Sequence, residues 1–254
     1  MENKIILGID TTGEKCSVGL AKNGEAFGGI SESTPQEHSD KLIHFVDRLL
    51  KKKHLKIEDI NAIAVSIGPG SFTGLRVGVA TAKALAQLLE IPIIGIPTLD
   101  IIALNAVQST EYRVQSKKKL ICSIVDARKE QVYAAVYETA PERHNVKVSK
   151  RREENKELKK ISEDLMLSIN DLLKLRTLYS VPCTVFFVGN GLKLYGDIIK
   201  KKLGKKALFV PQEFWYPSAI NIAIQGYKKL QKNEKGENLF ELKPKYIREP
   251  DIMK

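Results

Sequence analysis

Three short apolar runs open the chain, and each has the length of a β-strand. They cover Lys4 to Ile9, Cys16 to Ala21 and Ala26 to Ser31. Asn23-Gly24 separates the second run from the third and is typical of a tight hairpin, because both residue types tolerate a positive φ. The pattern predicts a meander of three antiparallel strands.

From Gln36 onward the apolar residues recur with the period of a helix. They are Leu42, Phe45, Val46, Leu49 and Leu50. This spacing predicts an amphipathic helix. The helix would end at Lys51 to Lys53, where the helix dipole favours positive charge.

A strand, a helix and a second strand follow. Ala62 to Ile67 is a continuous apolar run of strand length, a helix is predicted from about Thr73 to Leu89, and Ile93 to Ile96 is another short strand. Two apolar strands joined by a helix predict a right-handed parallel crossover. A meander that leads into such units is the layout of one half of an RNase H-like or actin-like domain.

The same order of elements recurs later in the chain. We predict strands at Leu120 to Asp126, Val132 to Tyr137 and Thr184 to Val188, and helices at Ile161 to Leu175 and Leu192 to Leu203. Two similar halves, each a β-meander followed by βαβα units, indicate an α/β chain with the actin-like ATPase (ASKHA, RNase H-like) fold.

A polar stretch from Asn105 to Lys117 marks the expected boundary between the halves. It gives an N-terminal subdomain of residues 1–108 and a C-terminal subdomain of residues 109–254. Within the latter, residues 147–160 form a basic insertion that we expect to be a solvated loop or helix face.

The composition favours a globular protein of the cytoplasm. Of the 254 residues, 43% are hydrophobic, which is enough to build a core. No apolar run reaches eighteen residues and no charged-then-apolar leader precedes the first strand, so we expect no membrane segment. Cys16, Cys122 and Cys183 lack a C-x-x-C spacing, and each is expected to be a small core residue.

A formal net charge of +11 indicates a surface that attracts polyanions such as RNA. Solubility alone also explains a lysine-rich surface, and both interpretations stay open. The basic runs are Lys51 to Lys53, Lys117 to Lys119, Lys147 to Arg152 and Lys200 to Lys206. Few aromatic residues accompany these runs, which favours contact with a nucleic acid backbone over stacking on single-stranded bases.

Two loops carry candidate chemistry. Asp10-Thr11-Thr12 follows the first strand and offers a carboxylate and two hydroxyls to a phosphate or its metal, although the same residues are ordinary in turns. Gly68 to Arg76 joins a strand to a helix, with Ser71 or Thr73 able to cap it. A helix start of this kind can bind an anion, but the loop is neither a P-loop nor a Rossmann fingerprint.

Small residues recur every fourth position along the helix that follows. They are Gly74, Gly78, Ala82 and Ala86. A flat strip of this kind allows another helix to approach closely. The approaching helix is either the one predicted at Leu42 to Leu50 or a helix of another subunit.

Five motifs in this order resemble the TsaB family, which serves the biosynthesis of threonylcarbamoyladenosine in tRNA. They are Gly8 to Thr12, Gly68 to Arg76 (G-P-G-S-F-T-G-L-R), Asp126 to Arg128, Val188 to Gly191 and Pro244 to Arg248. They span nearly the whole chain, and the second is highly specific as a unit. Ile247 stands where the family commonly has Leu.

The resemblance implies a non-catalytic subunit that binds the catalytic subunit TsaD, acts with the ATPase TsaE, meets tRNA through the complex, and forms a homodimer when alone. It also implies a partner interface on the two helices of the first half. The expected contact residues are Leu42, Phe45, Val46, Gly70, Phe72, Thr73, Gly74, Val77, Gly78, Ala82 and Lys83.

The resemblance further implies a vestigial nucleotide or phosphate site. Its residues would be Asp10, Thr11, Thr12, Asp126, Gly189 and Gly191. No cofactor is required, and weak binding of ATP or ADP stays open. TsaD carries a metal-binding histidine pair at i, i+4, whereas this chain has Thr98 and Ile102 there, so we expect neither a metal site nor catalytic residues. The four histidines (His38, His44, His54, His144) also include no such pair.

Two other functions compete with this one. An autonomous ASKHA small-molecule kinase or nucleotide hydrolase would use Asp10 and Asp126 to organise magnesium around ATP. A general RNA-binding module would rest on the net charge and would bind RNA without TsaD.

Overall fold

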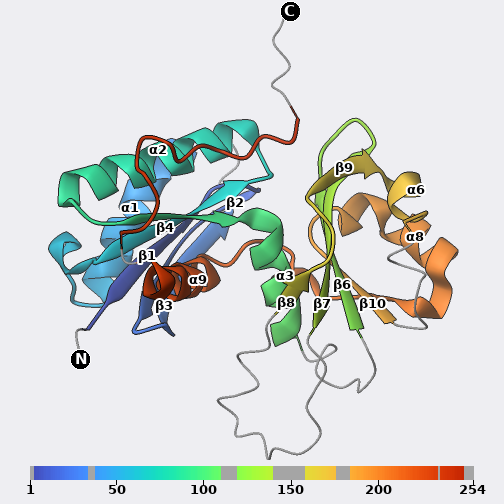
Figure 1. The fold of residues 1–254 in the computed structure, drawn as a ribbon, viewed down its shortest axis with the longest axis horizontal. Helices are drawn as coiled ribbons and strands as arrows, with labels where there is room; N and C mark the ends of the chain where they lie inside the picture. Colours follow the sequence, from blue (N-terminus) through green and yellow to red (C-terminus); the bar gives the residue numbers. More distant parts are fainter. Residues whose placement is uncertain are drawn as a thin grey trace, which may run out of the picture. The chain divides into compact units, whose positions relative to one another are not determined.

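The computed structural model describes residues 3–33, 38–109, 119–139, 158–175, 184–233 and 235–248. The chain forms two compact units (Figure 1). The first unit comprises Met1–Ile101 and Pro217–Lys254, and the second comprises Ile102–Tyr216. The two subdomains expected from the sequence, divided once at residue 108, differ from these units, because the chain returns to the first unit after Tyr216.

The first unit contains a five-stranded sheet in the order β3-β2-β1-β4-β5. The strands are β1 (Ile5–Asp10), β2 (Lys15–Lys22), β3 (Glu25–Ser33), β4 (Ala62–Gly68) and β5 (Ile93–Pro97). The first three are antiparallel, and β4 and β5 run parallel to β1. Asn23 and Gly24 both have positive φ, which confirms the predicted hairpin.

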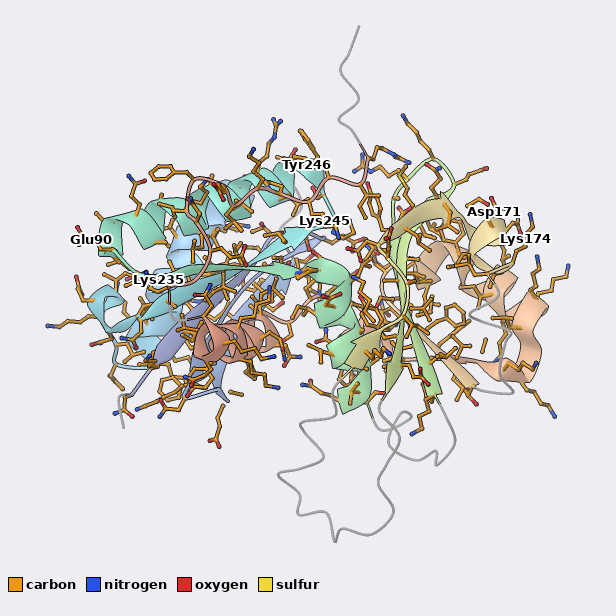
Figure 2. All side chains as sticks on the ribbon, in the orientation of Figure 1. Glu90, Asp171, Lys174, Lys235, Lys245 and Tyr246 are labelled. Atoms are coloured by element: carbon orange, nitrogen blue, oxygen red, sulfur yellow. The ribbon has the colours of Figure 1, made fainter. Side chains whose placement is uncertain are left out.

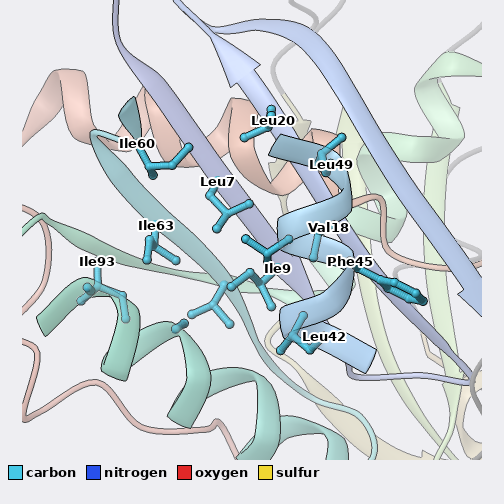
Figure 3. Close-up of a cluster of buried hydrophobic side chains, with 14 of the residues drawn as sticks. Leu7, Ile9, Val18, Leu20, Leu42, Phe45, Leu49, Ile60, Ile63 and Ile93 are labelled. Atoms are coloured by element: carbon cyan, nitrogen blue, oxygen red, sulfur yellow. The ribbon is translucent and has the colours of Figure 1, made fainter. Parts of the chain in front are cut away.

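Helices cover both faces of this sheet (Figure 1). On one face, α1 (His38–Lys52) and α2 (Phe72–Leu89) enclose an apolar core shown in Figure 3, in which Leu7 and Ile9 meet Phe45. On the other face lies α9 (Ala219–Lys232), which the sequence patterns did not predict. It packs so closely that a Cβ on Gly8 would overlap its backbone.

The second unit repeats the arrangement. Its strands are β6 (Lys119–Asp126), β7 (Gln131–Thr139), β8 (Leu158–Lys160), β9 (Leu165–Ser168), β10 (Thr184–Val188) and β11 (Ala207–Phe209). Their order is β11-β10-β6-β7-β8, and β9 also pairs with β7. As in the first sheet, the opening strand lies between an antiparallel and a parallel neighbour. The α/β actin-like fold with two similar halves is therefore confirmed.

The remaining helices are α3 (Thr98–Gln108), α6 (Ile169–Leu172), α8 (Leu192–Leu203) and the short 3-10 turns Ile57–Asp59, Gly204–Lys206 and Gln212–Phe214. The polar boundary was expected to begin at Asn105, but Asn105 and the residues up to Gln108 belong to helix α3. Within the described ranges, no helix combines the length and apolar character needed to cross a membrane.

The helix predicted from Ile161 to Leu175 is wrong. Most of that segment is β9 followed by the single turn of α6. Leu165 and Leu167 align with alternate residues of β7, and this pairing overrides the helix-like spacing. The basic insertion is described only from residue 158, where it forms β8 instead of a loop. Residues 147–157 lie outside the described ranges.

Candidate functional site

The turn after β1 is buried and bonded to the start of α2. Asp10, Thr11 and Thr12 are almost fully buried. Thr11 Oγ1 donates a hydrogen bond to the Gly74 carbonyl at 2.6 Å, and Thr12 Oγ1 donates one to Asp10 Oδ1 at 2.8 Å. The Ser71 N–H donates to the Thr12 carbonyl at 2.7 Å. The two hydroxyls that were expected to meet a phosphate are therefore engaged within the chain.

Burial also sets the protonation of the turn. Desolvation raises the pKa of Asp10 from 3.8 to about 6, and Ser66 and Thr12 offset part of that rise. Ser17 lies opposite Asp10 on β2. Among the described residues, the buried Ser17 Oγ has no hydrogen-bond partner. Asp10 is thus a buried carboxyl group whose charged form is poorly solvated.

The strip of small residues on α2 faces this turn. A Cβ on Gly74 would overlap the Thr11 carbonyl, and a Cβ on Gly78 would overlap Thr11 Oγ1. Ala82 and Ala86 continue the strip and are buried. At Gly74 and Gly78 the strip admits the Thr11 turn and not another helix, whereas Ala82 and Ala86 share an apolar core with Leu42 and Leu49 of α1. Ser71 caps α2 by accepting a hydrogen bond from the Gly74 N–H, as predicted.

The expected interface residues differ in their exposure. Leu42, Phe45, Val46, Gly74, Gly78 and Ala82 are buried within the first unit, Gly70, Phe72, Val77 and Lys83 are half-buried, and Thr73 is exposed. A partner that docks on these helices therefore meets mainly their outer surface. On α2 that surface includes a stripe formed by the exposed Thr73, Ala80, Ala84 and Leu88 and the half-buried Val77, which we call the α2 outer face; Arg76 and Gln87 are exposed beside it. Its spacing of i, i+4, i+7, i+11 and i+15 forms one continuous stripe.

In the second unit, Asp126 and the Gly189-Asn190-Gly191 turn are connected. Asn190 Oδ1 accepts a hydrogen bond from the Asp126 N–H at 3.0 Å, and Asp126 Oδ1 accepts one from the Arg128 N–H at 2.9 Å. Gly189 has φ of 119°, and a Cβ there would overlap the Ile124 carbonyl. The glycine is thus required by the close approach of this turn to β6.

The turn between β6 and β7 has an unusual backbone. Arg128, Lys129 and Glu130 have φ values of 59°, 50° and 58°, a region that non-glycine residues rarely occupy. The sequence does not signal this turn, because none of the three is Gly or Asn. Burial raises the pKa of Tyr195, and the Asp126 and Glu130 carboxylates raise it further.

The first unit also carries a cluster of two aromatic rings and a guanidinium group that the sequence patterns did not predict. The Arg76 guanidinium lies 4.0 Å from the centre of the Phe72 ring, and the Tyr246 ring lies 4.9 Å from that of Phe72. Arg76 Nε donates a hydrogen bond to the Tyr246 hydroxyl at 3.3 Å. We call these three residues the stacking cluster. No local pattern reveals it, because Arg76 and Tyr246 are 170 positions apart.

The positions that correspond to a metal-binding histidine pair are Thr98 and Ile102, one turn apart on α3 and both buried. Across the described ranges, no three His, Cys, Asp or Glu side chains lie together as metal ligands would. Cys16 and Cys122 are buried, as predicted. Cys183 and His144 lie outside the described residues.

Comparison with known proteins gives consistent matches. The family profile of TsaD, tRNA N6-adenosine threonylcarbamoyltransferase, matches residues 20–254. The TsaB protein of Escherichia coli is 38% identical over 133 residues, which cover 52% of this chain and 54% of that protein. The TsaB protein of Buchnera aphidicola from Schizaphis graminum is 37% identical over 133 residues, which cover 52% of this chain and 60% of that protein. These two alignments thus span little more than half of either relative.

Longer but weaker matches extend over the whole chain. The TsaB protein of Bacillus subtilis is 27% identical over 243 residues, which cover 96% of this chain and 93% of that protein. The structure of YeaZ from Pseudomonas aeruginosa superposes with a TM-score of 0.71 at 23% identity, covering 96% of this chain and all of YeaZ, and it shows the common fold. The chain therefore belongs to the TsaB/YeaZ family, within the wider group that the TsaD profile describes.

Proposed function

We propose that this chain is a non-catalytic subunit in the biosynthesis of threonylcarbamoyladenosine in tRNA, where it binds and supports the catalytic TsaD subunit. The names of its relatives support the pathway. The exposed apolar stripe of the α2 outer face supports a binding role. TsaE would join the same complex, and the chain would contact tRNA through that complex.

The α2 outer face has the character of a docking surface. Leu88 is 77% exposed, and Ala80 and Ala84 are also exposed. Exposed apolar side chains that form a stripe are costly to leave in water. Alanines at the centre of the stripe allow a partner helix to approach closely. The same surface would support a homodimer when TsaD is absent.

The residues expected at a phosphate site and at the position of the metal-binding pair support a binding role as well. The Thr11 and Thr12 hydroxyls are engaged within the chain, and Ile102 carries no metal-binding atom. The chemical step is therefore assigned to the partner. This division of work is a proposal for the complex.

Light scattering coupled to size-exclusion chromatography tests the proposal. The chain is measured alone, mixed with its cognate TsaD, and as the variant Leu88→Glu, which places a charge on the α2 outer face. Leu194→Glu is the matched control, because Leu194 is a helical leucine of similar exposure (62%) on α8.

We expect a homodimer that exchanges for a heterodimer with TsaD. Leu88→Glu should weaken both assemblies, and Leu194→Glu should leave both intact. A stable monomer that does not bind TsaD would overturn the proposal. If Leu194→Glu alone disrupted the heterodimer, the interface would have to move to the second unit.

A further inference from the structure

The two segments that form the stacking cluster carry basic but no acidic side chains. Helix α2 and the final described residues, 242–248, together contain no Asp or Glu. Their basic residues are Arg76, Lys83, Lys243, Lys245 and Arg248. A surface of one sign attracts phosphate groups, and this contribution weakens as salt rises.

The stacking cluster adds flat surfaces to this charge. Arg76 is exposed, and its guanidinium lies over the Phe72 ring. Tyr246 is 38% exposed beside it. Unpaired nucleobases stack on aromatic rings and on arginine planes.

The chain holds this cluster in place. The C-terminal segment runs over α2, where Figure 2 labels Lys245 and Tyr246. The Lys245 N–H donates to the Ile67 carbonyl at 2.6 Å, and Lys83 Nζ donates to the Leu242 carbonyl at 3.3 Å. Leu242 itself is buried in the core of the first unit. A platform that is already ordered loses little entropy when a ligand binds.

From this geometry we infer that the stacking cluster binds an unpaired base of single-stranded RNA, while the exposed Lys243 and Lys245 attract its phosphates. The choice of RNA rests on the proposed function, whereas base stacking rests on the cluster alone. Arg76 and Leu88 are twelve positions apart on α2, which corresponds to about 18 Å along the helix. The end of the α2 outer face that carries Ala84 and Leu88 is therefore left for a protein partner.

Fluorescence anisotropy with two labelled oligomers tests this inference. One is an oligoadenylate RNA of about 12 nucleotides, and the other is an abasic ribose-phosphate oligomer of the same length. The two carry equal charge, so only the bases distinguish them. The wild-type chain should prefer the RNA by about 5- to 100-fold, the range expected for stacking one base.

Three variants separate stacking from charge. Arg76→Lys keeps the positive charge but removes the planar group, and Tyr246→Leu keeps apolar packing but removes the ring. Both should lose most of the preference for the RNA. Lys243→Gln removes one of the exposed positive charges that would attract the phosphates, and it should weaken the binding of both oligomers by the same factor. Thermal unfolding of each variant shows whether the first unit stays folded.

Equal binding of the two oligomers by the wild-type chain would overturn the inference, and so would an Arg76→Lys variant with an undiminished preference. Association with TsaD is measured for the same variants. If Arg76→Lys abolished that association and kept the preference for RNA, the cluster would belong to the protein interface and the inference would be overturned. A Leu88→Glu variant that no longer binds TsaD but still prefers the RNA supports it.

Discussion

Replacing Asp10 with Asn should stabilise the folded chain at neutral pH. Burial raises the pKa of Asp10 from 3.8 to about 6, a change of about two units. Each unit corresponds to about 1.4 kcal/mol, so the charged carboxylate lowers the free energy of unfolding by about 3 kcal/mol. Asn is isosteric with Asp and carries no charge at any of these pH values.

The sign of the pH dependence follows from the two pKa values. Between about pH 4 and pH 6 the unfolded chain has released the Asp10 proton while the folded chain still holds it. The stability contributed by this group is therefore complete below pH 4, falls through that window, and stays low at neutral pH. In the Asp10→Asn variant the new amide oxygen would still accept the Thr12 hydrogen bond.

Urea unfolding followed by circular dichroism measures the effect. Tryptophan fluorescence would not report on the unit that contains Asp10, because the single tryptophan, Trp215, lies in the second unit. We expect Asp10→Asn to match the wild type near pH 4 and to exceed it by about 2–3 kcal/mol near pH 7.5. The difference between the two proteins isolates Asp10, because other titrating groups cancel. A variant less stable than the wild type at pH 7.5 would refute the reasoning, since Asp10 would then be stabilised as a carboxylate.

Two further predictions concern packing and thiol chemistry. Gly78→Ala should lower the free energy of unfolding by about 1–3 kcal/mol, because its Cβ overlaps Thr11 Oγ1, although helix propensity alone predicts a gain of about 1 kcal/mol. Ala84→Gly, on the exposed side of the same helix, should cost only about 1 kcal/mol in the same urea assay. Burial raises the pKa of Cys16 to about 12 and that of Cys122 higher still, so at most one of the three thiols should react with Ellman's reagent at pH 8 before denaturation.

Local patterns were sufficient for most elements of both sheets. Strands β1, β4 and β6 are continuous apolar runs, and α8 matches its predicted range of Leu192 to Leu203. Helix α9 was missed because its buried positions include Ala219, Ala223 and Gly226, which give a weak apolar signal. The two alanines are small because the helix lies directly on Gly8 of β1 and Gly19 of β2, and Gly226 is small because it faces Ala64 of β4. The weak apolar signal of α9 therefore follows from its contact with β1 and β2, which lie about 200 positions earlier in the chain.

The candidate site was predicted only in part. The sequence indicated the turn at Asp10 and the loop before α2 as separate features, and the structure joins them through Thr11 and Gly74. A hydroxyl next to a strand has the same sequence signature whether it meets a phosphate or a carbonyl of its own chain. Spacing along the chain therefore identified the residues but not their hydrogen-bond partners.

The two sides of α2 show what this difference means for function. Small residues on the inner side admit the Thr11 turn, so they are required for folding whether or not a partner exists. On the outer side, Ala80, Ala84 and Leu88 are exposed and lie outside the core of the first unit, so the fold of that unit does not explain their apolar character. Variants at the inner glycines would destabilise the fold, so they could not isolate an effect on a partner interface. Leu88→Glu leaves the core untouched and therefore tests the outer face, whereas Gly78→Ala also changes the packing against Thr11.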